Sequence, residues 1–328
     1  MTRVVFMGSP EEVVASLMYL RERGPAVGLD LVAVISQPAR PVGRGGRLTD
    51  PPVAEFAKSH QIVCLQPESS KAADFIQDFI ALSPDIVVTA AYGQILSDEF
   101  LAVPKIGTIN IHPSRLPQYR GATPVPAALL DGLTSTAVTI LFTVKKLDAG
   151  NIISQKDFAI DQAETSGILT ARLFLESGPM LLEALTLLAR DPSFKGIPQD
   201  DNKATFCRKI EKDMGCIDWS LDAATIVNRF RAFEPWPGTW TMAGDRRIAI
   251  TEIRVCSSSP ASPDRLGVVI FDKPSKALVV QAGSGCVAIT RLRPAGSKDM
   301  DAASFWNGLK DKANVTFHGV VDVGGHQL

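Results

Sequence analysis

An amide, an imidazole and a carboxylate stand out in this chain, because these three groups together can catalyse an acyl transfer. Asn110 and His112 are two residues apart at the predicted end of a strand, so both side chains point to the same face. Asp148 follows a second apolar run and can return to that face in an α/β sheet. The amide would stabilise a developing oxyanion, the imidazole would move protons, and the carboxylate would orient and charge the imidazole.

Each of these residues also has a simpler interpretation. His112 is one of four histidines, and a lone histidine near a strand end is more often structural than catalytic. Asp148 by itself would be a solvated loop acid before a turn glycine. The combination favours a site, because Asn110 shares a face with His112 and the segment 113–121 is rich in the rigid turn residues of a site loop.

The first two-thirds of the chain alternate strand and helix patterns. Ser9 is predicted to cap the first helix, with Pro10 at its first position. Repeated β–α units indicate a Rossmann-like, mostly parallel sheet, whose active site would lie beyond the carboxyl ends of the strands. The predicted strands are 3–7, 29–35, 85–90, 107–112 and 137–142, and the predicted helices are 12–23, 52–59, 72–82, 124–130 and 166–188.

The last third of the chain has a different pattern. A short helix (222–233) precedes several short strands at a spacing of about ten residues, which predicts a small β-barrel of the OB type. We expect an α/β catalytic domain over 1–204, with a connector from about 190, and a β-barrel domain over 205–328. The strands predicted for the barrel are 248–253, 267–270, 277–281 and 286–290.

Composition excludes several classes of protein. Hydrophobic residues make up 45% of the chain and charged residues 21%, which is ordinary for a soluble globular protein. No apolar run approaches the roughly 18 residues that a membrane span needs, and the amino terminus does not resemble a signal peptide. The five cysteines form no C-x-x-C pair, which argues against a disulfide framework and a zinc site. We expect a cytoplasmic protein.

A nucleotide cofactor is also disfavoured. The turn Gly8-Ser9-Pro10 follows the first strand but lacks the G-x-G-x-x-G spacing, and no P-loop motif is present.

Charge is distributed unevenly along the chain. The net charge is −1, but from Thr205 onward 16 Lys and Arg face 13 Asp and Glu, against 18 and 22 before it. The segment 37–48 holds Arg40, Arg44 and Arg47 with no acid. This asymmetry permits a polyanionic partner without requiring one, and a solvated basic loop is the simpler interpretation.

Several segments resemble the 10-formyltetrahydrofolate-dependent formyltransferase family. They follow in order over nearly the whole chain, and the Asn-x-His…Asp constellation is the mark of the wider family. The segments are 4–10, 37–45, 91–96, 110–121, 147–150, 217–219, 231–238 and 293–296.

The resemblance implies a role for each group of residues. Asn110, His112 and Asp148 would be the catalytic trio. The cosubstrate 10-formyltetrahydrofolate would lie along two strand-end loops, with backbone groups pairing with the pterin, although Ile95 and Leu96 could equally fill the core. The implied folate contacts are Ala91, Tyr92, Gly93, Ile95, Leu96, Ser114, Arg115, Leu116 and Pro117.

The arginine loop and the carboxy-terminal motifs imply a particular acceptor, the α-amino group of methionyl initiator tRNA. Arg40, Arg44 and Arg47 would reach the acceptor end of the tRNA, and the barrel would hold the acceptor arm through phosphates. Formylation of this tRNA serves translation initiation. The resemblance also implies a bacterial protein that acts as a monomer and needs no metal. The chain departs from the family pattern at Gly46, Arg115, Lys145, Lys146 and Asn151, and none of these changes removes the trio.

Two other functions stay open on the sequence alone. The same chemistry could serve a small amine acceptor, such as a sugar nucleotide or glycinamide ribonucleotide. The chain could also be a folate- or RNA-binding module without catalysis, although the intact trio disfavours this.

Overall fold

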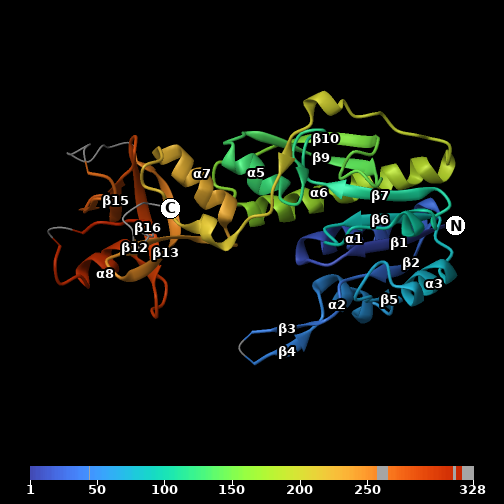
Figure 1. Cartoon of the computed structure of the whole chain (residues 1–328), viewed down its shortest axis with the longest axis horizontal. Helices are drawn as coiled ribbons and strands as arrows, with labels where there is room; N and C mark the ends of the chain where they lie inside the picture. The colour runs from blue at the N-terminus through green and yellow to red at the C-terminus, as the bar shows by residue number, and fades with distance from the viewer. Residues whose placement is uncertain (44, 257–264, 313–314, 320–328) are drawn as a thin grey trace. The chain divides into compact units, whose positions relative to one another are not determined.

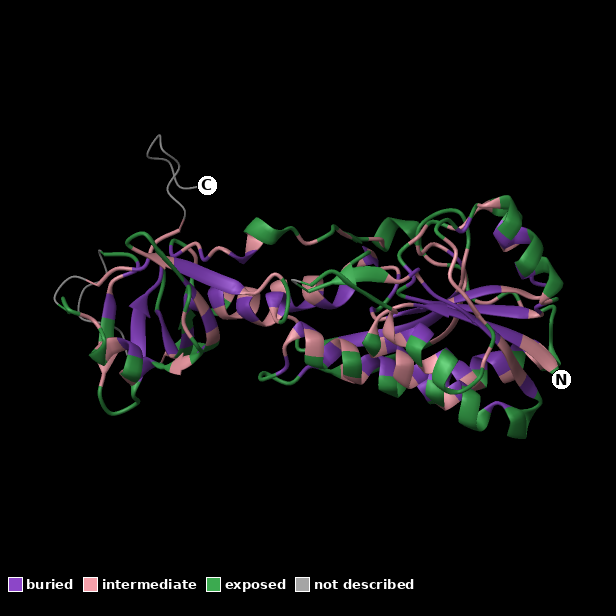
Figure 2. Cartoon of the chain, turned by 90° about the horizontal axis from the view of Figure 1, so that it is seen from below, coloured by how far each residue is buried: buried purple, intermediate pink, exposed green. Residues whose placement is uncertain are grey.

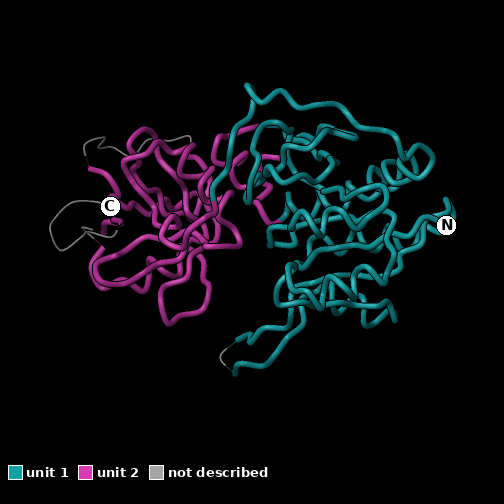
Figure 3. The backbone as a smooth tube through the Cα atoms, turned by 45° about the vertical axis from the view of Figure 1, so that its right-hand side comes forward, with its two compact units in different colours: residues 1–125, 134–160, 168–208 teal, residues 126–133, 161–167, 209–328 magenta. Residues whose placement is uncertain are grey.

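A computed structural model describes residues 1–43, 45–256, 265–312 and 315–319 of the chain. The chain divides into two compact units, drawn in different colours in Figure 3. The first unit comprises residues 1–125, 134–160 and 168–208, and the second comprises 126–133, 161–167 and 209–328. No helix among the described residues is long and apolar enough to cross a membrane.

A seven-stranded sheet forms the centre of the first unit (Figure 1), in the order β10-β9-β7-β6-β1-β2-β5. The five strands from β7 to β5 in this order are parallel, which confirms the predicted mostly parallel sheet. The apolar run of β6 is buried on both faces, since every one of its residues is buried. The strands are β1 (Thr2–Gly8), β2 (Leu29–Ile35), β5 (Cys64–Leu65), β6 (Ile86–Ala90), β7 (Gly107–His112), β9 (Ser135–Phe142) and β10 (Ile152–Ala159).

The strands β9 and β10 form an antiparallel extension of this sheet. His112 of β7 pairs with Thr139 of β9, and Ile109 pairs with Phe142, so β9 runs opposite to β7. The carboxyl end of β9 therefore lies away from the carboxyl end of β7. The loop after β9 must fold back for Asp148 to reach His112.

Helices pack on the sheet with one side buried and the other exposed (Figure 2). On one face, the rings of Phe79 and Phe100 stack at 4.3 Å between centroids, and both belong to a core cluster that includes Val5 and Val87 of the sheet. The helices that lie wholly or mostly in the first unit are α1 (Val14–Arg23), α2 (Pro52–Ser59), α3 (Ala73–Ala81), α4 (Asp98–Leu101) and α6 (Ser166–Arg190), with short 3-10 turns η1 (Glu11–Val13), η2 (Pro25–Val27) and η3 (Asp201–Lys203). Most of α5 (Pro124–Leu130) belongs to the second unit.

The start of the first helix differs from the prediction. Pro10 is the N-cap of the 3-10 turn η1, and no side chain of the described residues caps it. The hydroxyl of Ser9 instead accepts a hydrogen bond from the backbone N of Gln37 at 3.1 Å. Ser9 therefore ties the first turn to the end of β2, and the predicted capping role is wrong.

The basic segment 37–48 is not a plain loop. It forms an antiparallel hairpin of β3 (Arg40–Val42) and β4 (Arg47–Thr49), in which Arg40 pairs with Thr49 and Val42 with Arg47. This hairpin extends away from the sheet (Figures 1 and 3).

The second unit contains an antiparallel sheet in the order β12-β13-β16-β15-β14, with β17 beside β16. The segment 315–319 joins the two ends of this order. Met242 of β12 donates to His318 O at 2.9 Å, and Val269 of β14 donates to Val315 O at 3.0 Å. The sheet is thereby closed, as predicted for a barrel. The elements are η4 (Lys212–Gly215), α7 (Ala223–Phe233), β12 (Thr239–Ala243), β13 (Arg246–Cys256), β14 (Val269–Asp272), β15 (Ala277–Gln281), β16 (Cys286–Pro294), β17 (Met300–Asp301) and α8 (Ala302–Asn307).

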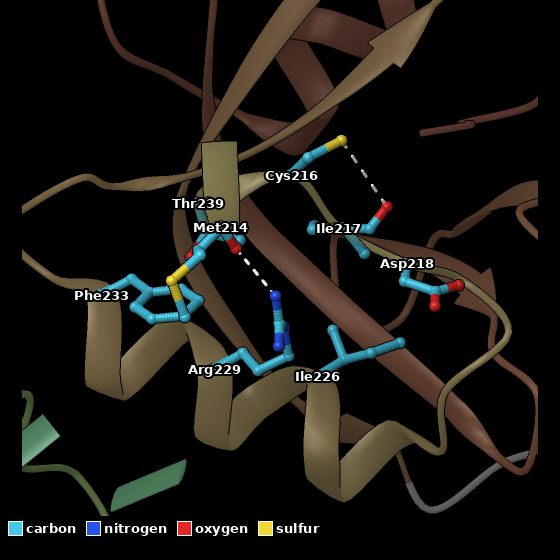
Figure 4. Close-up of a pocket in the computed structure, with 9 residues that line it drawn as sticks. Met214, Cys216, Ile217, Asp218, Ile226, Arg229, Phe233 and Thr239 are labelled. Carbon is cyan, nitrogen blue, oxygen red and sulfur yellow. Dashed lines mark hydrogen bonds between the residues drawn. The ribbon is translucent and has the colours of Figure 1, made fainter. Parts of the chain in front are cut away.

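A pocket against α7 is filled by the protein's own side chains (Figure 4). Arg229 of α7 points into it and donates to the carbonyl of Met214 at 2.8 Å. Its guanidinium also lies 5.1 Å from the ring of Phe233, and burial lowers the pKa of Arg229. This pocket is a packing feature of the second unit rather than a ligand site.

Candidate active site

Asn110 lies on β7 with its amide oriented by the neighbouring strand. The hydroxyl of Thr89, its pairing partner on β6, donates to Asn110 Oδ1 at 2.9 Å. The other side of the amide, Nδ2, has no hydrogen-bond partner among the described residues. Because Asn110 is half-buried, this NH₂ group is a donor that a bound molecule can use.

His112, at the end of β7, is 4% exposed and faces a polar neighbour at each ring nitrogen. Nε2 lies 2.9 Å from the carbonyl oxygen of Tyr119. A carbonyl only accepts, so Nε2 carries a proton and donates it. Nδ1 lies 3.8 Å from Oδ2 of Asp148, so a second proton on the ring would face the carboxylate.

Asp148 is held in a tight turn. Its φ of 47° lies in the left-handed region, and its Oδ2 accepts a hydrogen bond from the backbone N of Gly121 at 2.8 Å. Gly121 belongs to β8 (Arg120–Gly121), which pairs with β11 (Phe206–Cys207). A Cβ on Gly121 would come within 2.4 Å of Cys207 O, so this position requires glycine.

The structure thus brings His112 and Asp148 together, and Asn110 shares the face of β7 with His112. An amide donor, an imidazole and a carboxylate at one strand end can stabilise an oxyanion and move protons. No group of three or more His, Cys, Asp and Glu side chains in the described part of the chain could hold a metal ion.

The loop that follows β6 offers its backbone and one apolar side chain. Ala91 and Gly93 are exposed and have positive φ values of 44° and 88°, and Ile95 is 79% exposed. The side chains of Tyr92 and Leu96 pack instead in the core of the first unit. Burial raises the pKa of Tyr92 to about 12, and its hydroxyl has no hydrogen-bond partner within the ranges that the structure describes.

The loop that follows His112 is held in place by its own side chains. Ser114 is fully buried and its hydroxyl donates to Gln118 O at 2.8 Å, while Leu116 is also buried. Arg115 forms an ion pair with Asp157 of β10. The Leu116–Pro117 peptide bond is cis. Among the predicted contacts here, the side chains of Ser114 and Leu116 stabilise the loop itself.

The predicted tRNA-binding arginines have different surroundings. Arg40 forms an ion pair with Glu68 at 2.7 Å. Arg47 is exposed on β4 and lies next to Leu48, which is also exposed. Arg44 lies outside the described residues.

Sequence reasoning misses two groups of residues. Arg120 lies within the motif 110–121, where its residue type alone indicates no role, and Gln199 lies in a connector with no pattern of its own. In the second unit, the motif segments 234–238 and 293–296 line one groove of about 470 Å³. There the guanidinium of Arg247 stacks 4.1 Å over the ring of Trp240. The sequence could have indicated this groove only through its two family motifs, because residues of both line it.

Comparison with known proteins defines the class. The formyl transferase model matches residues 2–185, and the model of the formyl transferase C-terminal domain matches residues 209–310. The chain therefore belongs to the formyl transferase family, which confirms the resemblance seen in the motifs.

Two curated relatives from the formyl transferase family are similar to this chain over nearly its whole length. The methionyl-tRNA formyltransferase of Listeria monocytogenes is 40% identical over 314 residues, covering 94% of this chain and 96% of its own. That of Staphylococcus epidermidis is 34% identical over 312 residues, covering 95% and 97%. The fold is also similar to that of HypX from Aquifex aeolicus in complex with tetrahydrofolic acid, with a TM-score of 0.62 and 18% identity over 96% of this chain and 50% of that one.

Proposed function

We propose that this protein is a methionyl-tRNA formyltransferase. It transfers the formyl group of 10-formyltetrahydrofolate to the α-amino group of methionyl initiator tRNA, for translation initiation in the bacterial cytoplasm, and it acts as a monomer. The observation that carries this proposal is the His112–Asp148 pair in a chain that matches methionyl-tRNA formyltransferases over nearly its whole length.

The three site residues divide the chemistry. The neutral amine attacks the formyl carbon, and the carbonyl electron pair moves to oxygen. The free Nδ2 of Asn110 donates a hydrogen bond to this oxyanion. Nδ1 of His112, the ring nitrogen without a proton, takes the proton that the attacking nitrogen loses and delivers one to N10 of the folate as the carbon–N10 bond breaks. Asp148 balances the positive charge on the ring while His112 holds the proton.

The folate lies along the loops after β6 and β7. The exposed backbone of Ala91 and Gly93 can pair with the polar edge of a pterin, and Ile95 can cover its ring. Of the sequence-based contacts, Tyr92, Leu96, Ser114 and Leu116 act by shaping these loops. Arg115 and Pro117 line the second loop.

The β3–β4 hairpin contacts the tRNA acceptor end. Arg47 and Leu48 are exposed together, so they offer a guanidinium and an apolar surface to unpaired nucleotides. Arg40 and Arg44 add charge for the phosphates. In the second unit, Arg247 and Arg293 supply positive charge along the groove that they line.

The test is formyl transfer from 10-formyltetrahydrofolate to methionyl initiator tRNA, with elongator methionyl-tRNA and an amino sugar nucleotide as competing acceptors. Formylation of the initiator tRNA above both competitors supports the proposal. Transfer to the sugar nucleotide alone would assign the protein to a small acceptor instead.

A further inference from the structure

A buried arginine next to the site is connected to the turn that carries Asp148. The guanidinium of Arg120 is fully buried. Its Nε and Nη2 donate to Oε1 of Gln199 at 3.1 and 2.8 Å, and its Nη1 forms an ion pair with Asp201 at 2.8 Å. Both partners belong to the connector that follows α6, so Arg120 joins this connector to β8.

Gln199 continues the connection to the turn. Its Nε2 donates to the carbonyl oxygens of Asp148 and Gly150, at 2.8 and 2.7 Å. The amide therefore uses two donors and two acceptor positions. Because a guanidinium only donates and a carbonyl only accepts, the orientation of this amide is fixed by its neighbours.

Asp148 needs such support. Its left-handed backbone is uncommon for a residue other than glycine, and its carboxylate accepts only one backbone bond among the described residues, from Gly121. The same strand β8 supplies both Gly121 and Arg120, and Arg120 N also donates to Thr205 O of the connector at 2.9 Å. The carboxylate and the carbonyl of Asp148 are thus both held from β8, one directly and the other through Gln199.

We propose that Gln199, itself held by Arg120, is a positioning residue for Asp148. It fixes the turn so that the carboxylate faces Nδ1 of His112. This inference rests on the proposed function, because its main measurement is formyl transfer. A misplacement of about 1 Å at a catalytic group can cost about 100-fold in rate, so the effect should be visible in kcat.

The informative variant is Gln199→Glu. It has nearly the same shape and keeps an acceptor for Arg120, but it sets an oxygen against the carbonyls of Asp148 and Gly150. We expect kcat to fall by about 10- to 100-fold, while KM for folate and tRNA changes by less than about threefold. Gln199→Ala removes the same bonds without repulsion and should lower kcat in the same direction.

Asn151→Asp is the matched control. Asn151 Nδ2 donates to the carbonyl of Lys195 on the same connector at 2.7 Å, and among the described residues its side chain bonds to neither Asp148 nor Gly150. The exchange of amide for acid is identical, so kcat should stay within about twofold of wild type. An equal loss of kcat in this control would show that any weakening of the connector has the same effect, and would overturn the specific role of Gln199.

A double variant tests the route through Asp148. In an Asp148→Asn background, Gln199→Glu should change kcat by less than about twofold, because the carboxylate that it positions is gone. If the losses of kcat in Gln199→Glu and Asp148→Asn multiply in the double variant, the inference is overturned. It is also overturned if Gln199→Glu and Gln199→Ala both keep the kcat of wild type.

A second readout does not depend on turnover. The ¹⁵N resonances of the His112 ring should move in Gln199→Glu and stay in Asn151→Asp. Unchanged resonances would overturn the positioning role, even if the wild-type protein formylated no tRNA. An inactive wild type with shifted resonances would overturn the proposed function alone.

Discussion

The hydroxyl of Thr89 on β6 lies 2.9 Å from Oδ1 of Asn110, its direct pairing partner on β7, and 3.1 Å from the carbonyl oxygen of Ile109. The contact with Oδ1 is the shorter of the two, and in it the hydroxyl donates its proton to the amide oxygen. With Oδ1 occupied, the NH₂ group is left as a donor without a protein partner among the described residues. Thr89 on β6 therefore orients the amide of Asn110 on β7 so that its NH₂ group can donate to an oxyanion.

Removing this donor should slow the chemical step. We expect Asn110→Ala to lower kcat by about 100- to 1000-fold, since the oxyanion loses a hydrogen bond. Thr89→Val should lower kcat by about tenfold, because the amide is no longer oriented. Both effects are measured as steady-state kcat for methionyl-tRNA.

Thr108→Val is the control for this pair. Thr108 is buried in β7 and its hydroxyl has no partner in the part of the chain that the structure describes, so the same substitution there should leave kcat unchanged. A loss in Thr108→Val equal to that in Thr89→Val would show that the sheet, rather than the amide, is being disturbed.

The His112–Asp148 pair should carry proton transfer. His112→Ala and Asp148→Asn should each lower kcat by about 100- to 10,000-fold with circular dichroism unchanged. Asparagine is chosen at position 148 because it tolerates the left-handed turn. His60→Ala, on the exposed end of α2, should keep full activity. Near wild-type turnover in His112→Ala would remove the imidazole from the mechanism.

Tyr92→Phe should stabilise the protein. The Tyr92 hydroxyl is buried without a partner among the described residues, so its removal should raise the free energy of unfolding by about 1 kcal/mol at pH 7. Burial also raises the pKa of Tyr92 to about 12. Its ordinary value is about 10, so the unfolded chain ionises first and stability falls as the pH rises from about 10 through 12.

Urea unfolding at pH 7 and at several pH values above about 9 measures both effects. Tyr92→Phe should lose less stability above about pH 10 than wild type. A lower stability of Tyr92→Phe at pH 7 would mean that the hydroxyl has a partner in solution.

The hairpin arginines should differ in their contribution to tRNA binding. Arg47→Ala should raise KM for methionyl-tRNA more than Arg40→Ala, because Arg40 is already paired with Glu68. Removing one phosphate-binding charge should lower the slope of log KM against log salt by about one. Arg44→Ala should also weaken tRNA use. Folate binding measured alone should not change, and a parallel weakening of it would contradict the assignment of the hairpin to tRNA.

Much of the fold follows from apolar runs in the sequence. These runs predict the strands over 29–35 and 107–112 with the bounds observed, because short runs rich in apolar residues are typical of strands in a parallel sheet. The strand β10 is missed, since its exposed middle (Gln155, Lys156 and Asp157) lacks such a run. The antiparallel direction of β9 also leaves no mark in the sequence.

The site is predictable in part. The i, i+2 spacing places Asn110 and His112 on one face, but the approach of Asp148 depends on a loop that folds back after β9. The sequence assigns no role to Arg120, since arginines are rarely buried and its partners lie in the distant segment 199–201.

The segment 315–319 lies beyond the region 209–310 that the family's C-terminal model matches, yet it bonds to β12 on one side and to β14 on the other. A chain that ended before residue 315 would leave both strands with unpaired N–H and C=O groups. Unpaired backbone groups along an exposed strand can form hydrogen bonds with strands of neighbouring molecules. These few residues therefore protect the protein against edge-to-edge aggregation, a role separate from catalysis and from tRNA binding.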